Sequence, residues 1–180
     1  HIYNRIDPAE DIEVIHLELI LKDLEVVKKR MGNVESEIRA QNPVRGGASN
    51  GARKEAEAEK EILEKMKMAL EEGKLLNDMF ARENEDAERI ARQIGLLTMK
   101  PIIFVCNGSE EMAQNGWMPD TALKTAMGNR AFVVLSAKIE DELNSLDDTE
   151  RREFLQSMGR DRSGLEDLIR TGYETLGLIT

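Results

Sequence analysis

A single apolar stripe runs through the first forty residues and constrains the fold more than any other feature. Its apolar side chains recur at spacings of three and four residues, at Leu17, Leu21, Leu24, Val27, Met31, Val34 and Ile38. This spacing places them on one face of an α-helix. Asp7 and Pro8 supply an N-cap and a first-turn proline. We predict a helix over 9–40, roughly 45 Å long at about 1.5 Å per residue.

A second long helix follows a segment that cannot continue the first. Residues 41–51 contain a proline and several glycines without apolar periodicity, which predicts a loop. From Ala52 onward one helical face carries Ala56, Leu63, Met66 and Leu70. We expect the two long helices to pack as an antiparallel hairpin with coiled-coil-like contacts, and a shorter helix to follow at 83–93.

The character of the chain changes near residue 98, where short β-branched runs replace the helix-forming residues. Residues 101–106 and 131–135 are continuously apolar, which predicts fully buried strands of a parallel sheet. A helical pattern at 120–127 lies between them and completes a βαβ unit. Further helices are expected at 139–144, 148–158 and 164–176, with Asp147 and Ser163 as caps. The second half therefore predicts an α/β fold.

Charge and cysteine content exclude several classes of function. Lys+Arg 25 against Asp+Glu 35 gives a net charge of −10, which argues against a general phosphate-backbone binder, and we expect no sequence-specific DNA partner. No apolar run approaches the ~20 residues of a membrane span, so no membrane partner is expected. The single cysteine, Cys106, shares no metal-like spacing with His1 or His16, so no metal ligands are predicted. We expect a cytoplasmic protein.

Two polar loops directly follow the two predicted strands. The first is Asn107-Gly108-Ser109-Glu110 and the second is Ser136-Ala137-Lys138. In open parallel sheets, ligands bind beyond the carboxyl ends of the strands. The base-recognition loops of P-loop nucleotide hydrolases, N-K-x-D and S-A-K, occupy these positions. We therefore predict a purine-binding site formed by Asn107, Gly108, Glu110, Ser136, Ala137 and Lys138.

Glu110 departs from the guanine-selective pattern. An Asp at this position accepts two hydrogen bonds from guanine, whereas Glu is one methylene longer, and Gly108 replaces the usual Lys. Adenine offers N7 and N1 as acceptors and N6 as a donor, which suits the Asn107 amide and an unobstructed Gly108 main chain. We predict relaxed or adenine-favouring recognition. Spacing alone leaves open a plain capped turn, in which Ser109 and Glu110 only start a helix.

Several segments resemble the YchF-type, Obg-related family of P-loop ATPases. Residues 11–25 resemble the segment after the second switch, and 95–101 resemble the approach to the first strand. Residues 136–140 and 163–180 also match, so that the resemblance covers nearly the whole chain in the family's order. The family carries N-x-x-E in place of N-K-x-D, which is similar to the first loop here.

The resemblance implies a domain organisation. The fold would be the C-terminal part of a P-loop NTPase domain with an inserted antiparallel coiled-coil arm. Residues 1–8 would connect from the N-terminal part of the nucleotide-binding domain, 9–95 would form the arm, and 96–180 would form the C-terminal part of that domain. The P-loop, the first switch and the Mg²⁺ ligands are expected before His1, and a TGS domain after the last helix.

The resemblance also implies a function, which is the nucleotide-binding part of a ribosome-associated ATP/GTP hydrolase. Asn107 and the Gly108 main chain would contact the base, with support from Glu110 and the 136–138 loop. Mg²⁺ would accompany ATP or GTP in the longer protein. We expect the chain alone to be inactive, because the nearest match to G-x-x-x-x-G-K-[ST], at 46–51, is followed by Ala-Arg and by no Lys-Ser/Thr.

Basic residues gather near the predicted hairpin tip, among them Arg45, Arg53 and Lys54. Since the resembling family associates with ribosomes, we expect these three residues to contact RNA or a protein partner. A solvated loop is the alternative for the tip. For the whole chain, the alternative function is a non-catalytic helical-hairpin interaction module with a small α/β cap.

Overall fold

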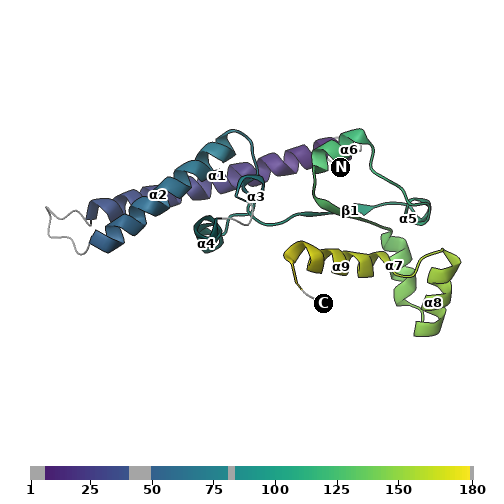
Figure 1. The fold of residues 1–180 in the computed structure, drawn as a ribbon. Helices are drawn as coiled ribbons and strands as arrows, with labels where there is room; N and C mark the ends of the chain where they lie inside the picture. The colour runs from purple at the N-terminus through teal and green to yellow at the C-terminus, as the bar shows by residue number, and fades with distance from the viewer. Residues whose placement is uncertain (1–6, 41–49, 81–83, 179–180) are drawn as a thin grey trace. The chain divides into compact units, whose positions relative to one another are not determined.

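The computed structural model describes residues 7–40, 50–80 and 84–178. The chain divides into two compact units (Figure 1). Asp11–Lys100 form one, here called the helical unit, and Pro101–Thr180 with His1–Glu10 form the other, here called the α/β unit. Most of the loop predicted at 41–51 lies outside the described residues.

The first half of the chain is helical, as its periodicity predicts. Its elements are α1 (Pro8–Ala40), α2 (Asn50–Glu71), α3 (Leu76–Met79) and α4 (Glu85–Ile94). The predicted cap of α1 is confirmed, because the Asp7 carboxylate accepts a hydrogen bond from Glu10 N at 3.1 Å. The short helix α3 is not predicted from the sequence, since four residues are too few to show a helical period.

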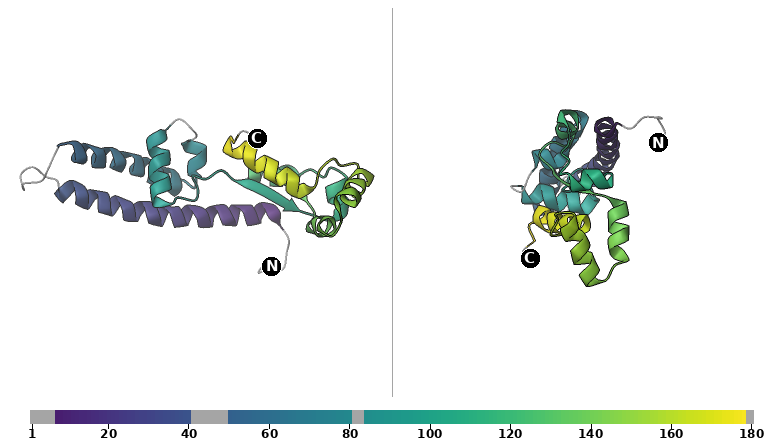
Figure 2. Two further views of the ribbon diagram at one scale, coloured as in Figure 1. Left: turned by 90° about the horizontal axis from the view of Figure 1, so that it is seen from below. Right: turned by 90° about the vertical axis from the view of Figure 1, so that its right-hand side faces the viewer.

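Apolar side chains on facing sides of the helices form the core of the helical unit. Figures 1 and 2 show α1 and α2 side by side with opposite chain directions. The residues buried between the elements are Ile20, Val27 and Val34 of α1, Leu63, Met66 and Leu70 of α2, Leu76 of α3, and Ile90 of α4. Regular burial at helical spacing is the physical reason that this charged sequence forms a compact unit.

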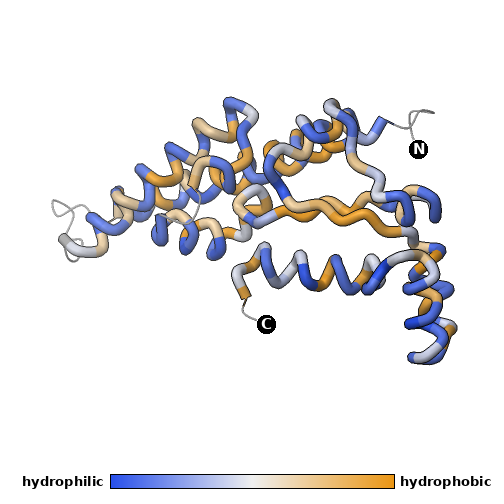
Figure 3. Tube along the Cα trace, turned by 45° about the vertical axis from the view of Figure 1, so that its right-hand side comes forward, coloured by the Kyte–Doolittle hydropathy of each residue, from blue (hydrophilic) through white to orange (hydrophobic). Residues whose placement is uncertain are grey.

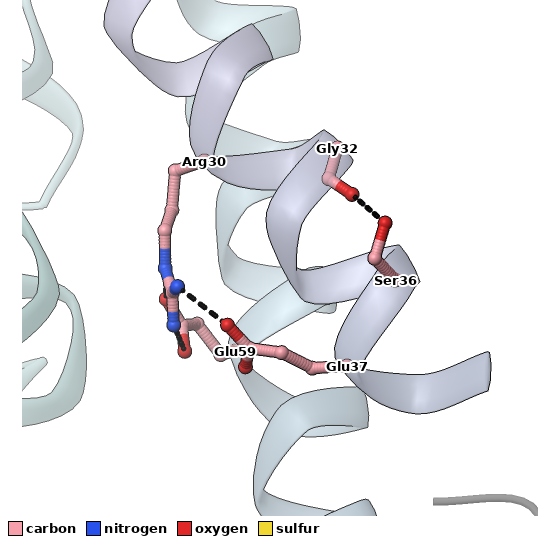
Figure 4. Close-up of polar contacts among 5 residues, drawn as sticks. All are labelled: Arg30, Gly32, Ser36, Glu37 and Glu59. Atoms are coloured by element: carbon pink, nitrogen blue, oxygen red, sulfur yellow. Dashed lines mark hydrogen bonds and ion pairs between the residues drawn. The ribbon is translucent and has the colours of Figure 1, made fainter. Parts of the chain in front are cut away.

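Ion pairs between α1 and α2 flank this core. The Arg30 guanidinium donates to both carboxylate oxygens of Glu59, from Nε at 2.7 Å and from Nη2 at 2.8 Å, and it also donates to Glu37 at 2.9 Å (Figure 4). These hydrogen bonds raise the pKa of Arg30 above its ordinary value. Lys60 pairs with Glu35 at 3.0 Å. The pairs join the second half of α1 to the first half of α2, which fits the opposite chain directions.

The buried face of α1 differs from the predicted stripe in its first half. Leu17 and Leu21 belong to the predicted stripe, yet they are 54% and 53% exposed. Ile20 and Asp23 are buried instead, at 5% and 1% exposed. The predicted stripe is wrong at these positions. A pattern of apolar residues alone cannot identify the buried face of a helix when that face includes a carboxylate, here that of Asp23.

The buried Asp23 carboxylate ties α1 to the segment that follows α4. It accepts hydrogen bonds from Leu97 N at 2.9 Å, from Thr98 N at 2.7 Å and from Thr98 Oγ1 at 2.7 Å. A carboxylate is retained in a protein interior when hydrogen bonds replace its lost hydration. Asn77 N donates to Thr98 O at 3.0 Å, so the same segment is also held by α3.

The α/β unit is built on two short parallel strands. These are β1 (Ile103–Asn107) and β2 (Ala131–Leu135), paired in register from Ile103↔Ala131 to Asn107↔Leu135. The helices of this unit are α5 (Glu110–Gln114), α6 (Thr121–Met127), α7 (Ala137–Asn144), α8 (Asp148–Ser157) and α9 (Gly164–Leu176). Asp147 and Ser163 form capping boxes at α8 and α9, as predicted.

The prediction that both strands are fully buried is wrong. Val133 is buried, but Val105 is 46% exposed, and the other strand residues are partly or largely exposed. Figure 3 shows both strands as hydrophobic along their length, with α9 beside them. In the described residues the sheet has only two strands, and α9 and α5 are the helices that pack against them most, which leaves most strand residues half-buried.

Candidate base-binding site

The parallel register brings the two predicted loops to the same edge of the sheet. Asn107 and Leu135 are partners at the ends of β1 and β2. One residue further on, Gly108 N donates to Leu135 O at 2.9 Å. The two loops therefore begin side by side, as required of two groups that contact one ligand.

The Asn107 side chain bridges the two loops directly. Its Oδ1 accepts a hydrogen bond from Ala137 N at 3.0 Å. Because a backbone N–H can only donate, this contact assigns the amide oxygen to Ala137 and leaves the Nδ2 group as a donor. The N7 atom of both adenine and guanine is an acceptor, so Nδ2 is suited to either purine.

A second bridge joins the charged residues of the loops. Lys138 Nζ lies 2.6 Å from Glu110 Oε1, and the side chains are 70% and 43% exposed. This hydrogen bond, followed by the negative charges of Glu110 and Glu142, raises the pKa of Lys138 above its ordinary value. The charged groups of the two loops therefore form an ion pair with each other, and this pair is accessible to solvent.

Gly108 offers less free main chain than the sequence suggests. Its N–H is already used in the bond to Leu135, which leaves its carbonyl as the group to consider for a base. A Cβ at Gly108 would lie 3.0 Å from the Sδ and Cε atoms of Met112, so a side chain here would press on that methionine. The glycine is thus favoured by local packing as well as by the proposed contact.

The capped-turn alternative describes the same residues correctly in its local geometry. Ser109 is the N-cap of α5, and its Oγ accepts a hydrogen bond from Met112 N at 3.2 Å. Glu110 is the first residue of that helix. A capped helix start does not conflict with base binding, since the groups that bridge to the second loop are other atoms of the same segment.

The second loop is anchored by the start of α9. Ser136 is 3% exposed, and Glu140 Oε1 accepts a hydrogen bond from Gly164 N at 2.7 Å. A Cβ at Gly164 would lie 2.5 Å from Leu135 Cβ, so only glycine permits this approach. The predictions from the sequence did not include this contact. The available signals were an acidic residue shortly after S-A-K and a glycine directly after a helix cap.

Of the three basic residues predicted to make contacts at the hairpin tip, one is paired with an acidic side chain of its own helix. Arg45 lies outside the described residues. Arg53 Nε donates to Glu57 at 2.8 Å within α2, whereas Lys54 is exposed. Of the neighbouring basic residues, Arg39 pairs with Glu35 within α1 at 3.6 Å. Much of the positive charge near the tip is therefore compensated within the helices.

The described residues give little support to a metal site, a reactive cysteine or a membrane span. Residues 7–40, 50–80 and 84–178 contain no group of three or more His, Cys, Asp or Glu side chains that could hold a metal ion. Burial raises the pKa of the Cys106 thiol, which disfavours the reactive thiolate. None of the described helices combines the length and the apolar character that crossing a bilayer requires.

Known proteins of one family are similar to this chain. The chain is 35% identical over 184 residues to the Bacillus subtilis protein named ribosome-binding ATPase YchF, with the whole chain covered. Over its whole length, the chain is similar to part of a YchF-family protein. It is also 33% identical over 181 residues to the protein of that name from Escherichia coli O157:H7. The chain spans 47% and 46% of the lengths of these two YchF proteins.

The fold is also that of a solved YchF structure. The Schizosaccharomyces pombe YchF GTPase superposes with a TM-score of 0.76 at 23% identity, covering 98% of this chain and 46% of that one. No protein-family model matches the chain. The likeness supports a mostly helical α/β fold with a small parallel sheet.

Proposed function

We propose that this chain supplies the base-recognition loops and the helical arm of a ribosome-associated ATP/GTP hydrolase. The Asn107–Ala137 hydrogen bond carries the proposal, because it joins the two loops and orients an amide donor at the sheet edge. The names of the relatives, which are ribosome-binding ATPases or a GTPase, support hydrolysis of a nucleoside triphosphate by the longer protein.

The base would be held by groups of both loops. Asn107 Nδ2 donates to purine N7, and the Gly108 carbonyl accepts from the N6 amine of adenine. Glu110 and the Ser136-Ala137-Lys138 loop support these contacts from the side, through the bridges described above. All of these contacts suit adenine, and none of them requires guanine, so recognition is relaxed or favours adenine.

The domain assignment completes the proposal. Residues 9–95 form the antiparallel arm inserted in a P-loop domain, 96–180 form the C-terminal part of that domain, and 1–8 connect the arm to the N-terminal part of that domain. The motif G-x-x-x-x-G-K-[ST] does not occur in the sequence, so the chain alone does not hydrolyse nucleotide. The described residues offer no set of Mg²⁺ ligands, so Mg²⁺ would be held by the nucleotide phosphates and by other parts of the longer protein.

The decisive experiment removes the donor of Asn107 but keeps its bridge. In the full-length protein, Asn107→Asp retains an oxygen for the Ala137 N–H and loses the Nδ2 group. We expect ADP affinity by calorimetry to fall about tenfold, equivalent to one lost hydrogen bond of ~1.4 kcal/mol. Asn144→Asp, at the exposed end of α7, is the matched control. Unchanged ADP affinity in Asn107→Asp would remove the base site from this position.

The ribosome is the proposed macromolecular partner, and the hairpin tip is the proposed contact. Replacing Arg45, Arg53 and Lys54 by Ala in the full-length protein should weaken ribosome co-sedimentation and reduce its dependence on salt. Binding that is unchanged at every salt concentration would exclude the tip. A cytoplasmic location follows from this partner.

A second candidate function is a non-catalytic interaction module built on the helical hairpin. It is favoured by Val14, Leu17 and Leu21, which share a face of α1 and are 43%, 54% and 53% exposed. This function requires no nucleotide. Absence of ADP and GDP binding by the full-length protein would therefore favour it over the hydrolase.

A further inference from the structure

We propose that the ion pair between Lys138 and Glu110 sets the choice between adenine and guanine at this site. The inference rests on the proposed function, because it concerns the same two loops. Guanine-selective loops present a free carboxylate and a free backbone N–H to the base edge. In this structure both groups are engaged by the protein itself, and Lys138 is the residue that engages the carboxylate.

The carboxylate of Glu110 is held by a charge-assisted hydrogen bond. Guanine presents N1–H and the exocyclic amine as donors, and both need an acceptor of this kind. Lys138 Nζ already donates to Glu110 Oε1 at 2.6 Å, which is short for a bond between an ammonium group and a carboxylate. The two donors of guanine would occupy both oxygens of this carboxylate, so guanine must compete with the Lys138 ammonium group for Oε1, whereas adenine carries no N1–H and does not compete.

The backbone N–H of the second loop is engaged in the same manner. Guanine O6 is an acceptor and would need a donor from this loop. Ala137 N donates to Asn107 Oδ1 at 3.0 Å, so recognition of O6 would cost the bond that orients the Asn107 amide. At the same position of the ring adenine carries an amine, which is a donor and makes no demand on Ala137.

Lys138 has a second acidic neighbour, with which it can pair in place of Glu110. Glu142, one turn further along α7, lies 3.9 Å from Lys138 Nζ. If Lys138 moves to Glu142, the Glu110 carboxylate is released without leaving the ammonium group unpaired. The pair is exposed, so salt also weakens it. Lys138 is thus a specificity-determining residue that acts through Glu110.

The test compares ADP and GDP binding by calorimetry in the full-length protein. Lys138→Met frees Glu110, and we expect the affinity for GDP relative to ADP to rise by up to about fivefold, the range of an exposed ion pair. The double variant Lys138→Met with Glu110→Gln should show no rise, because the released acceptor has lost its charge. Lys124→Met, on the exposed surface of α6, is the matched control.

A measurement on the unaltered protein guards against a variant that does not fold. Raising the salt concentration should increase the GDP-to-ADP affinity ratio of the wild type and should leave that of Lys138→Met constant. A ratio that Lys138→Met and salt both leave unchanged overturns the inference, as does an equal loss of affinity for both nucleotides. If the wild type binds neither nucleotide, it is the proposed function that fails.

Discussion

The two units of the chain are stabilised in different ways. The helical unit is closed around its own side chains, and Leu63, Met66, Leu70 and Ile90 are almost completely inaccessible to solvent. Among the largest fully buried side chains of the described residues, only Leu143 and Ser163 belong to the α/β unit. Both units leave large apolar side chains exposed, among them Met68 of the helical unit at 62% and Leu176 of the α/β unit at 62%, so the difference lies in the buried core and not in the exposed surface.

The buried core that stabilises the chain most and the candidate site therefore lie in different units. Burial of apolar surface contributes most to folding, and it is concentrated in the unit that lacks the candidate base-binding loops. The loops are held by single polar contacts, such as Asn107 with Ala137 and Glu140 with Gly164. We therefore expect core substitutions to act on the helical unit most strongly, and substitutions around the site to act locally.

The largest effect is expected from the core of the helical unit. Leu63→Ala removes a side chain that is 0% exposed and should lower the free energy of unfolding of this unit by about 3 kcal/mol, because a cavity remains. Met68→Ala in the same helix, at 62% exposed, should change it by less than about 0.5 kcal/mol. Urea unfolding combined with hydrogen exchange measures both. Equal effects would show that Leu63 does not lie in a closed core.

A smaller effect is expected from the buried carboxylate of the helical unit. Asp23→Ala leaves the N–H groups of Leu97 and Thr98 without their acceptor and should cost about 2 kcal/mol. Thr98→Val removes only the hydroxyl contact and should cost about 1 kcal/mol. Hydrogen exchange of the 97–98 amides is the readout. If these amides stay protected in Asp23→Ala, Asp23 does not hold the segment.

The smallest effect is expected in the α/β unit, at the contact beneath the second loop. Gly164→Ala places a Cβ 2.5 Å from Leu135 Cβ and should destabilise this unit by about 1.5 kcal/mol, as overpacking does. Gly172→Ala, in the middle of the same helix with open space around it, should instead stabilise by about 0.5 kcal/mol. Thermal unfolding with hydrogen exchange over 131–140 distinguishes the two. Matching signs would disprove the close approach at Gly164.

The elements of the fold were largely predictable, since each depends on residues close together in the chain. The spacing of Val27 and Val34 predicts α1, and the apolar run 131–135 predicts β2. The positions of both loops followed in turn, because they come directly after the strands. Burial was harder to predict, since the pattern that marks a buried strand does not show which elements will cover it, as the exposed Val105 illustrates.

Partners far apart along the chain were beyond prediction. Asp23 meets Thr98 across 75 positions, and Asn107 meets Ala137 across 30. Nothing in the local pattern distinguishes these polar groups from others of the same type. Their pairing depends on where packing places each backbone, which is a property of the whole unit.

The amino-acid sequence by itself determined most of the helices, the parallel strands and the loops that carry the candidate site, because periodicity, caps and apolar runs act over a few residues. Only the tertiary structure decided which atoms of those loops remain available, since Ala137 and Lys138 turn out to engage Asn107 and Glu110. Hydrogen bonds form over about 3 Å, and such distances are set by the folded backbone.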